Sequence, residues 1–231
     1  IGGNVLKWFS SYLLIRQMLV RVDQSKSDIF DNTCGVPQGS ILGPILFTLY
    51  TISLGKLIRS CSVNYHLYAD DTQLYLSFDH SDSDNAVIQL ENCITAIKSW
   101  MVSHKLKMND SKTDVICIGS KLMLGKVNFS SINIVGTSLE CKDQVKSLGV
   151  IVDSHMTMFH QINDVCRTAY FHLRNISRVK KYLSRELLAC VIHSLVFSKL
   201  DYCNSLYLSL PASQLAKLQR VQNAAARILS G

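Results

Sequence analysis

The residues best suited to do chemistry are two adjacent carboxylates, Asp70 and Asp71, in the tetrapeptide Tyr68–Asp71. Runs of β-type residues on both sides place the pair at the tip of a tight hairpin. Side chains alternate between faces along a strand, but at a turn both carboxylates can reach one exposed point. Like charges this close repel each other unless a cation lies between them. The pair therefore predicts a Mg²⁺ site suited to displacement at phosphorus.

A solvated turn is the alternative interpretation of these carboxylates, because Asp is common in turns. Length and charge bear on the choice. The chain has 231 residues, of which 48% are hydrophobic, enough for a packed core. Its net charge of +7 is uneven: residues 1–115 carry 10 basic and 11 acidic residues, and residues 116–231 carry 14 and 6. This favours a metal site beside a phosphate-binding surface, although a basic surface can also serve solubility alone.

The cysteines and apolar runs indicate the compartment. The eight cysteines are spread singly, and the absence of a Cys-x-x-Cys pair argues against a zinc ribbon. Unpaired cysteines fit an intracellular, reducing location in the nucleus, the cytoplasm or both. The apolar runs are too short or too interrupted to span a bilayer, so we expect no membrane partner. Because the chain begins with Ile1, we expect it to be an internal piece of a longer protein.

Periodicity and turn residues predict mixed elements in the first two thirds of the chain. We expect an α+β domain over residues 1–155, made of the following elements: a helix over 5–20, a short extended segment at 29–34, a helix from the loop 35–43 to about Ile58, a hairpin over 64–78, a helix starting at Asp82 or Asp84, strands near 105–108 and 113–118, and a strand over 145–152. After Asp153 strand signals vanish, and helices are predicted over 158–182, 184–200 and 211–229. The domain boundary is therefore expected near residue 155.

Two segments, Gly35–Phe47 and Tyr68–Tyr75, together resemble the reverse transcriptase of LINE-type (non-LTR) retrotransposons. Further similar segments follow in the order of that family: Leu106–Thr113, Lys146–Val150, Leu200–Ser205 and Gln219–Arg227. The resemblance covers essentially the whole chain. It implies a partial right-hand polymerase palm over residues 1–155, with a mixed or antiparallel sheet and helices. An all-helical thumb would follow over residues 156–231.

The resemblance also implies an activity, with partners and a cofactor. A member of this family extends a DNA primer on an RNA template with deoxynucleoside triphosphates, by two-metal nucleotidyl transfer with Mg²⁺. Asp70 and Asp71 would be its catalytic metal ligands, Asp70 the more important. A third carboxylate would lie upstream of the region matched here, so we expect the chain alone to catalyse little synthesis. The alternatives are an inactive element remnant that acts at most as a nucleic-acid-binding module, and a helical protein-interaction domain.

The resemblance also implies roles for residues near the incoming nucleotide. Pro37, Gln38 and Gly39 would contact the incoming nucleotide or template, because glycine lets backbone approach closely and Gln38 can donate and accept hydrogen bonds. Tyr68 and Ala69 would lie beside the primer end, where the small Ala69 leaves room. Lys112 could protonate or neutralise the leaving pyrophosphate. An ordinary loop and a surface lysine are the alternative interpretations.

Two further sets would hold the nucleic acid backbone. Lys146, Leu148 and Gly149 would lie against the primer, with Gly149 allowing close approach and Leu148 packing inward. Four basic residues share one predicted helix face at i, i+7, i+11 and i+14: Arg167, Arg174, Arg178 and Lys181. Such a stripe can follow a duplex phosphate backbone without reading sequence, although it can also be a solvated helix face. The oligomeric state is not predicted.

Overall fold

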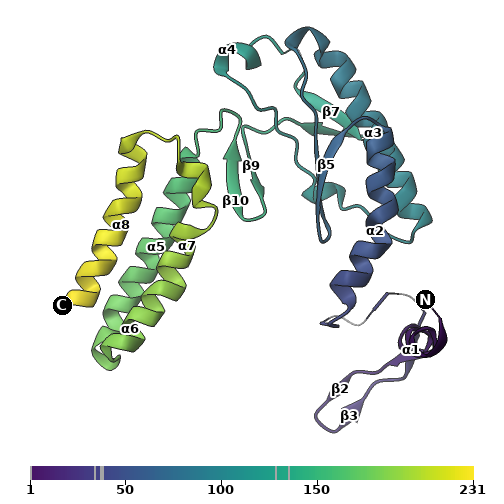
Figure 1. Ribbon diagram of the computed structural model, residues 1–231, viewed down its shortest axis with the longest axis horizontal. Coiled ribbons are helices and arrows are strands. Elements are labelled where there is room, and N and C mark those ends of the chain that lie inside the picture. The colour runs from purple at the N-terminus through teal and green to yellow at the C-terminus, as the bar shows by residue number, and fades with distance from the viewer. Residues whose placement is uncertain (1, 34, 37–38, 128, 135) are drawn as a thin grey trace. The chain divides into compact units, whose positions relative to one another are not determined.

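The computed structural model describes residues 2–33, 35–36, 39–127, 129–134 and 136–231. The chain forms two compact units, Ile1–Tyr75 and Leu76–Gly231. Helices and small two-stranded antiparallel sheets make up the described residues (Figure 1), which confirms the α+β class. In this described part, no helix combines the length and apolar character needed to cross a membrane.

The first unit opens with helix α1 (Gly3–Leu13) and a long bent hairpin. Strand β1 (Arg16–Met18) pairs with β4 (Phe30–Asn32), and β2 (Arg21–Val22) pairs with β3 (Ser25–Lys26). The helix predicted over residues 5–20 is therefore wrong beyond Leu13. Ile15 has a positive φ of 50°, which a helix cannot accommodate, and the following backbone groups pair across strands instead. The extended segment predicted at 29–34 contains β4, and its last residue, Cys34, lies outside the described residues.

Helix α2 (Gly43–Ser60) and the hairpin of β5 (Asn64–Tyr68) and β6 (Asp71–Tyr75) complete the first unit. Both were predicted from sequence and both are confirmed. Pro44 lies in the first turn of α2, where a missing N–H breaks no helical hydrogen bond. The buried residues of α2 include Leu54, Gly55 and Ile58.

In the second unit, helix α3 (Ser83–Ser103) packs against the hairpin of β7 (Ser131–Ile134) and β8 (Thr137–Glu140). The Asn133 amide donates to Glu91 Oε1 at 2.6 Å, which joins the two elements. The start of α3 agrees with the prediction, but the β7–β8 hairpin was not predicted. Its signal is present in the alternating burial of β7, where Ile132 and Ile134 are buried, and in Gly136 with φ of 86° at the turn.

The strand pair predicted at 105–108 and 113–118 does not form. The amides of His104, Lys105 and Leu106 donate back to carbonyls at the end of α3, so they are not available for a sheet. A short 3-10 helix, Asp110–Lys112, takes the place of the predicted turn. Residues 113–118 contribute an isolated parallel bridge between Val115 and Cys141, and a short helix α4 (Lys121–Leu124) follows.

The strand predicted over residues 145–152 is two strands, β9 (Gln144–Ser147) and β10 (Val150–Asp153), paired antiparallel. Leu148 and Gly149 form the turn with φ of 46° and 84°. Positive φ at both central residues is the feature of type I′ turns, which match the twist of a hairpin. Gly149 adopts this conformation without strain, whereas Leu148 does not have that freedom.

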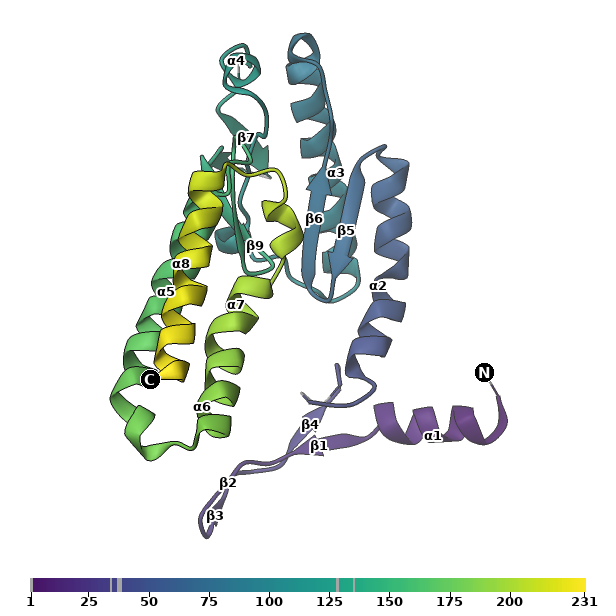
Figure 2. The same cartoon turned by 60° about the vertical axis from the view of Figure 1, so that its left-hand side comes forward.

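All regular structure after residue 158 is helical, as predicted. The main helices are α5 (Phe159–Val179), α6 (Arg185–Ile192), α7 (Ser198–Asp201) and α8 (Ala212–Ser230), with a π-helical segment His193–Phe197 between α6 and α7. Ser184 caps α6 by accepting a hydrogen bond from the Leu187 amide. These helices lie side by side in both views (Figures 1 and 2). Their core contains Val165, Ala169, Leu173, Ile176, Leu188, Ile192, Val196, Leu200, Val221 and Ala225.

The junction between strands and helices is built around Asp153, whose side chain is buried. Its carboxylate accepts hydrogen bonds from the amides of His155, Thr157 and Met158, at 3.2, 2.9 and 2.8 Å. Thr157 Oγ1 also donates to it at 3.1 Å. Residues 153–158 are thus held in a defined conformation, and the boundary near residue 155 stays a prediction.

Replacing Asp153 with Asn is expected to lower the free energy of unfolding by about 1–3 kcal/mol at pH 7. The backbone amides that donate hydrogen bonds to the carboxylate would lose their charged acceptor. Burial raises the pKa of Asp153, but hydrogen bonds from Thr157, Met158 and His155 outweigh it and leave the pKa below its ordinary value. The contribution is therefore complete above the unfolded pKa of about 3.9 and is lost as pH falls through the folded pKa. Urea unfolding of parent and variant across this range measures the difference.

The control for this change is Asp143→Asn, which alters an exposed carboxylate in the same unit. It is expected to leave the unfolding free energy within about 0.5 kcal/mol of the parent. A stability difference between parent and Asp153→Asn that stays constant from neutral to strongly acidic pH would show that the carboxylate charge has no part in the junction.

Candidate active site

The tip of the β5–β6 hairpin carries the two predicted carboxylates. Tyr68 and Asp71 form the last cross-strand pair, and Ala69 and Asp70 form the turn, with Ala69 at φ of 52°. Both Asp side chains are exposed, and neither has a hydrogen bond or ion pair with another residue in the part of the chain described. The predicted position at an exposed hairpin tip is confirmed.

The pleat of the hairpin separates its two faces. Tyr65 and Leu67 on β5 are half-buried, whereas His66 and Tyr68, which alternate with them, are exposed. Cross-strand partners share a face, so Asp71 lies on the exposed face with Tyr68. The His66 and Tyr75 rings stack on one another with centroids 5.3 Å apart. The exposed face of the hairpin therefore presents aromatic rings and the side-chain amides of Asn64 and Gln73, as well as Asp71.

Helix α2 supports the hairpin from the opposite face. Gly55 is buried on α2, and a Cβ added there would lie 2.5 Å from Tyr65 Oη and 3.0 Å from its Cζ. The Arg59 guanidinium lies 5.6 Å from the centre of the same ring. Glycine at this position leaves room for the end of the Tyr65 side chain against the helix. Sequence reasoning missed this contact, although a glycine inside an apolar helix was a visible signal for it.

Substituting Gly55 with Ala is expected to destabilise the chain by about 1–2 kcal/mol. The added methyl group overlaps the Tyr65 hydroxyl, and this overpacking outweighs the gain of up to about 1 kcal/mol in helix propensity. Adding Tyr65→Phe removes the overlapping oxygen and is expected to restore part of the loss. The unfolding free energies of the two single variants and the double variant measure this coupling. Additive effects of the two substitutions would contradict the contact.

The loop before α2 is only partly described. Pro37 and Gln38, predicted to contact nucleotide or template, lie outside the described residues. Gly39 is exposed at φ of 79°, with open space where a side chain would be. At the start of α2 the Gly43 amide donates to the Ser40 carbonyl at 3.1 Å, and Leu42 gives no side-chain cap.

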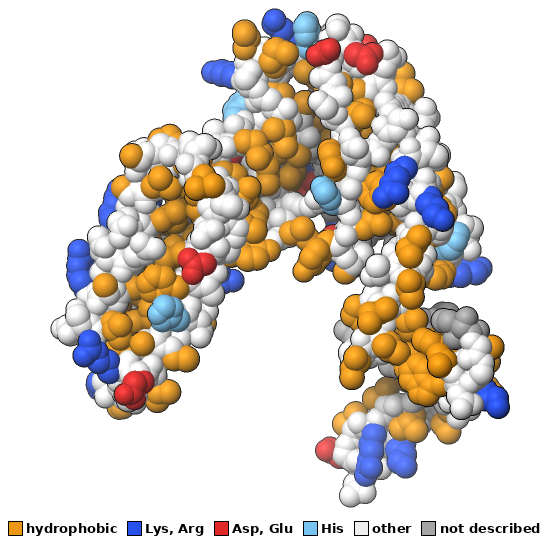
Figure 3. All heavy atoms as spheres, viewed as in Figure 1, with side chains coloured by type: hydrophobic (Ala, Val, Ile, Leu, Met, Phe, Trp, Pro, Cys, Tyr) orange, Lys and Arg blue, Asp and Glu red, His pale blue; other side chains and the backbone are white. Residues whose placement is uncertain are grey.

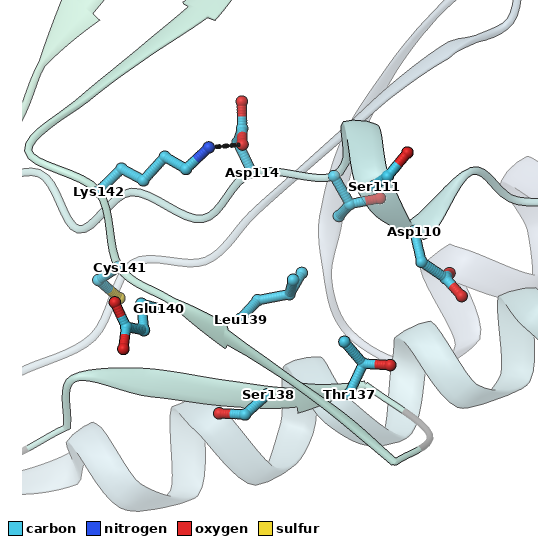
Figure 4. A pocket seen from close by; sticks show the side chains of 10 residues that line it. Asp110, Ser111, Asp114, Thr137, Ser138, Leu139, Glu140, Cys141 and Lys142 are labelled. Carbon is cyan, nitrogen blue, oxygen red and sulfur yellow. Dashed lines mark hydrogen bonds and ion pairs between the residues drawn. The ribbon is translucent and has the colours of Figure 1, made fainter.

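Lys112 ends the 3-10 helix Asp110–Lys112 and is exposed, and it lies near an acidic hollow within the second unit. The hollow has a volume of about 520 Å³ and is lined by residues 110–111, 113–114 and 137–142 (Figure 4). Asp110 pairs with Lys98 at 3.0 Å and Asp114 with Lys142 at 2.5 Å. With Glu140 as a third carboxylate, this hollow does not suit a phosphate group. None of the predicted site residues that the structure describes lines it.

The predicted primer-contacting residues lie on the β9–β10 hairpin. Lys146 is exposed on β9, opposite Ile151. Val150 is buried as predicted, but the prediction that Leu148 packs inward is wrong, since it is 38% exposed at the turn. The register places Leu148 in the two-residue turn, where the strand alternation that would direct it inward no longer applies.

The predicted basic stripe is exposed along α5 and the turn after it. Arg167, Arg174, Arg178 and Lys181 are all exposed, and they lie about 180° around the helix axis from the buried residues. Arg167 pairs with Asp164 on the same helix, and Lys181 lies 4.9 Å from the Tyr182 ring centre. Arg174 and Arg178 have no side-chain partner among the described residues. Figure 3 shows Lys and Arg side chains along the edge of this helical part.

A preformed metal cluster of protein ligands is not part of the described structure: no group of three or more His, Cys, Asp or Glu side chains among the described residues could hold an ion. Burial raises the pKa of the Cys117 and Cys141 thiols, which keeps them protonated at neutral pH. Asp70 and Asp71 differ from other exposed carboxylates of the described part in being adjacent at a hairpin tip, where two oxygen ligands without protein partners stand together.

The chain is similar in sequence to known proteins over most of its length. Residues 4–152, which include the β5–β6 hairpin and all but the last residue of the β9–β10 hairpin, match the family described as reverse transcriptase (RNA-dependent DNA polymerase). A probable RNA-directed DNA polymerase from transposon BS of Drosophila melanogaster is 30% identical over 72% of this chain and 18% of the relative. The corresponding protein from transposon X-element of the same species is 24% identical over 96% of the chain and 24% of the relative.

The RNA-directed DNA polymerase from mobile element jockey of Drosophila funebris is 23% identical over 100% of this chain and 25% of the relative. The chain thus spans a quarter or less of the curated relatives it matches. No solved structure matches it. The family match covers well over half of the chain, and the relatives are polymerases of mobile elements. The chain belongs to the reverse transcriptase family, among the RNA-directed DNA polymerases of LINE-type (non-LTR) retrotransposons.

Proposed function

We propose that this chain carries the catalytic hairpin of a retrotransposon polymerase that copies an RNA template into DNA. The observation that supports this most strongly is the pair Asp70 and Asp71, exposed and without protein partners at a hairpin tip inside the matched region. The reaction joins the primer 3′ oxygen to the α-phosphorus of a deoxynucleoside triphosphate and releases pyrophosphate. Its partners are an RNA template, a DNA primer and the triphosphates, with no membrane.

Asp70 and Asp71 are the residues that would hold Mg²⁺. Reverse transcriptases generally use divalent metal ions, and two adjacent carboxylates provide the hard oxygen ligands that Mg²⁺ prefers. When bound, the ion would polarise the reacting phosphate and stabilise the developing negative charge. A third ligand would come from another part of the polymerase, since no third carboxylate joins this pair among the described residues. Asp70, in the turn itself, is the more important ligand.

The residues around this pair would position the reactants. Ala69 leaves space beside the carboxylates for the primer end, and the exposed ring of Tyr68 offers a stacking surface to a nucleotide. Pro37, Gln38 and Gly39 would contact nucleotide or template ahead of α2. Lys112 would act on the leaving pyrophosphate.

The second unit would hold the duplex. Lys146, Leu148 and Gly149 at the β9–β10 hairpin would contact the primer backbone. The exposed stripe of Arg167, Arg174, Arg178 and Lys181 would bind phosphates of the RNA–DNA hybrid through charge alone. The acidic hollow beside Asp110 is excluded from this role by its charge.

The division into a palm over residues 1–155 and a thumb over 156–231 belongs to the same proposal. The family match ends at residue 152, and helix α5 begins at Phe159, which supports a boundary between them. The seven described cysteines are free, which fits a reducing compartment in the nucleus, the cytoplasm or both.

The test is primer extension by the full-length polymerase that contains this segment. With a heteropolymeric RNA template, a DNA primer, four deoxynucleoside triphosphates and Mg²⁺, the expected product is DNA complementary to the template. Extension is expected to stop when a chelator removes the metal. A purified polymerase that binds the primer–template but adds no nucleotide under these conditions would contradict the proposal.

The second candidate is an inactive element remnant that binds nucleic acid. The basic stripe favours it, because phosphate binding by Arg174 and Arg178 does not depend on the carboxylates. The same assay separates the two functions: binding without extension is the result that this second candidate predicts.

A further inference from the structure

The hydroxyl group of Tyr202 reaches across the second unit to the β9–β10 hairpin. It donates a hydrogen bond of 2.7 Å to the carbonyl of Leu148, 54 residues away in sequence. A Cβ added at Gly149 would lie 3.6 Å from Tyr202 Cε1, an ordinary contact distance. The hydroxyl of Tyr202 therefore binds Leu148, and its ring lies beside Gly149, the other residue of the hairpin turn.

The backbone around Tyr202 has the shape needed for this contact. Helix α7 ends at Asp201, Tyr202 is extended with φ of −63° and ψ of 117°, and Cys203 is left-handed with φ of 55°. This reversal turns the chain into the 3-10 helix Asn204–Tyr207. In Figures 1 and 2 the hairpin lies beside α7. The π-helical segment His193–Phe197 precedes α7, and such segments are frequent at functional sites.

Two other contacts fasten the hairpin to the helices. Val150 is buried in a cluster with Met158, Ile162 and Tyr207. The buried Gln161 accepts a hydrogen bond from the Ile151 amide at 2.8 Å through its Oε1. Both contacts hold strand β10, whereas Tyr202 alone of the three holds the turn. Tyr202 is 50% exposed, so the hydrophobic core does not require its side chain.

We propose that Tyr202 is a positioning residue that fixes the tip of the β9–β10 hairpin to the helical body. The hairpin and the basic stripe of α5 then hold the primer–template as one rigid body. This inference rests on the proposed function, because it assigns a partner to the same surface. Without the hydrogen bond the turn moves relative to the helices, and small displacements of a positioning element reduce productive binding.

The test compares Tyr202→Phe with Tyr170→Phe in the full-length polymerase. The first removes only the hydroxyl that donates to Leu148. The second removes a hydroxyl from the exposed side of α5 that has no hydrogen-bond partner among the described residues. We expect Tyr202→Phe to raise the Kd for primer–template about fivefold, the value of one net hydrogen bond. Product length in a single binding event, measured with a competitor trap, should fall by a similar factor.

Two further readouts separate positioning from a structural role. The KM for deoxynucleoside triphosphate should match that of Tyr170→Phe, and the melting temperature should fall by no more than a few degrees, the cost of one hydrogen bond. Equal Kd and product length in the two variants would overturn the proposal, and so would a melting temperature so low that part of the Tyr202→Phe protein is unfolded under the assay conditions. Primer–template binding needs no catalysis. A parent enzyme that fails to extend primers would therefore refute the proposed function while the Kd comparison still decides the role of Tyr202.

Discussion

Replacing Asp70 with Asn in the full-length polymerase is expected to lower the rate of DNA synthesis by at least about a thousandfold, because metal ligation supplies several kcal/mol of transition-state stabilisation. The substitution keeps the size and shape of the side chain and removes its charge. Asp70 has no other partner among the described residues, so the change is not expected to affect folding. Single-turnover primer extension at saturating primer–template measures the rate of the chemical step.

Two comparisons make this prediction specific. Asp71→Asn should also slow synthesis, but less than Asp70→Asn. Asp79→Asn alters another exposed carboxylate close by in sequence and should match the parent. The Kd for primer–template should be nearly the same in all four proteins. If Asp70→Asn retained more than about a tenth of the parent rate, several kcal/mol of stabilisation could not come from this carboxylate.

Reversing two charges of the stripe, Arg174→Glu with Arg178→Glu, is expected to weaken binding of RNA–DNA hybrid strongly at low salt. These are the two arginines of the stripe without a side-chain partner in the described structure. For each phosphate that is no longer neutralised, the dependence of log Kd on log salt should flatten by about one unit, so the double variant should show a slope smaller by about two. Titrations over a range of salt concentrations, with hybrids of unrelated sequence, measure both effects. The weakening should not depend on sequence.

The matched control is Lys121→Glu with Lys126→Glu, at helix α4 and just beyond it. Both lysines are exposed, and the change in net charge is the same. This variant should keep most of the affinity and nearly the parent salt slope. A stripe variant that binds as tightly as the parent, or no more weakly than this control, would mean that the stripe is a solvated helix face.

Local signals were sufficient where neighbouring residues decide the conformation. The β5–β6 hairpin was predicted because two alternating runs flank a short polar turn, and the structure forms that hairpin with Asp70 in the turn. The helices α5 and α8 were predicted from their periodicity and the turn residues between them. The stripe on α5 followed from the same period, since its exposed face is determined once the apolar face is buried.

Local signals failed where distant residues compete for the same backbone. Residues 14–20 have helical apolar spacing, but β1 gains a partner in β4, which lies more than ten residues further along the chain. The apolar residues near 105–108 suggested a strand, but their amides complete the end of α3. Leu148 was expected to pack inward because the turn at residues 148–149 was not recognised, and a shift of one residue reverses the face.

The contacts that position the candidate site could not be derived from sequence. Gly55 and Tyr65 meet because α2 packs against β5, and Tyr202 meets Leu148 across 54 residues. Gly55 is conspicuous inside an apolar helix, but nothing in its segment identifies Tyr65 as the residue it meets, and Tyr202 carries no local signal of its partner. Sequence patterns determine which elements form, but such contacts depend on how the elements pack in three dimensions.

The central claim is that the β5–β6 hairpin holds the metal used for DNA synthesis. Iron-mediated cleavage of the backbone tests this most directly, because Fe²⁺ can replace Mg²⁺ at oxygen ligands. With added hydrogen peroxide as oxidant and ascorbate to reduce Fe³⁺ again, the bound iron generates hydroxyl radicals that cut nearby peptide bonds. In the full-length polymerase with primer–template bound, we expect cleavage at residues 68–72. Mg²⁺ should suppress the cleavage, and Asp70→Asn with Asp71→Asn should abolish it. Cleavage confined to other segments, or unchanged in the double variant, would contradict the claim.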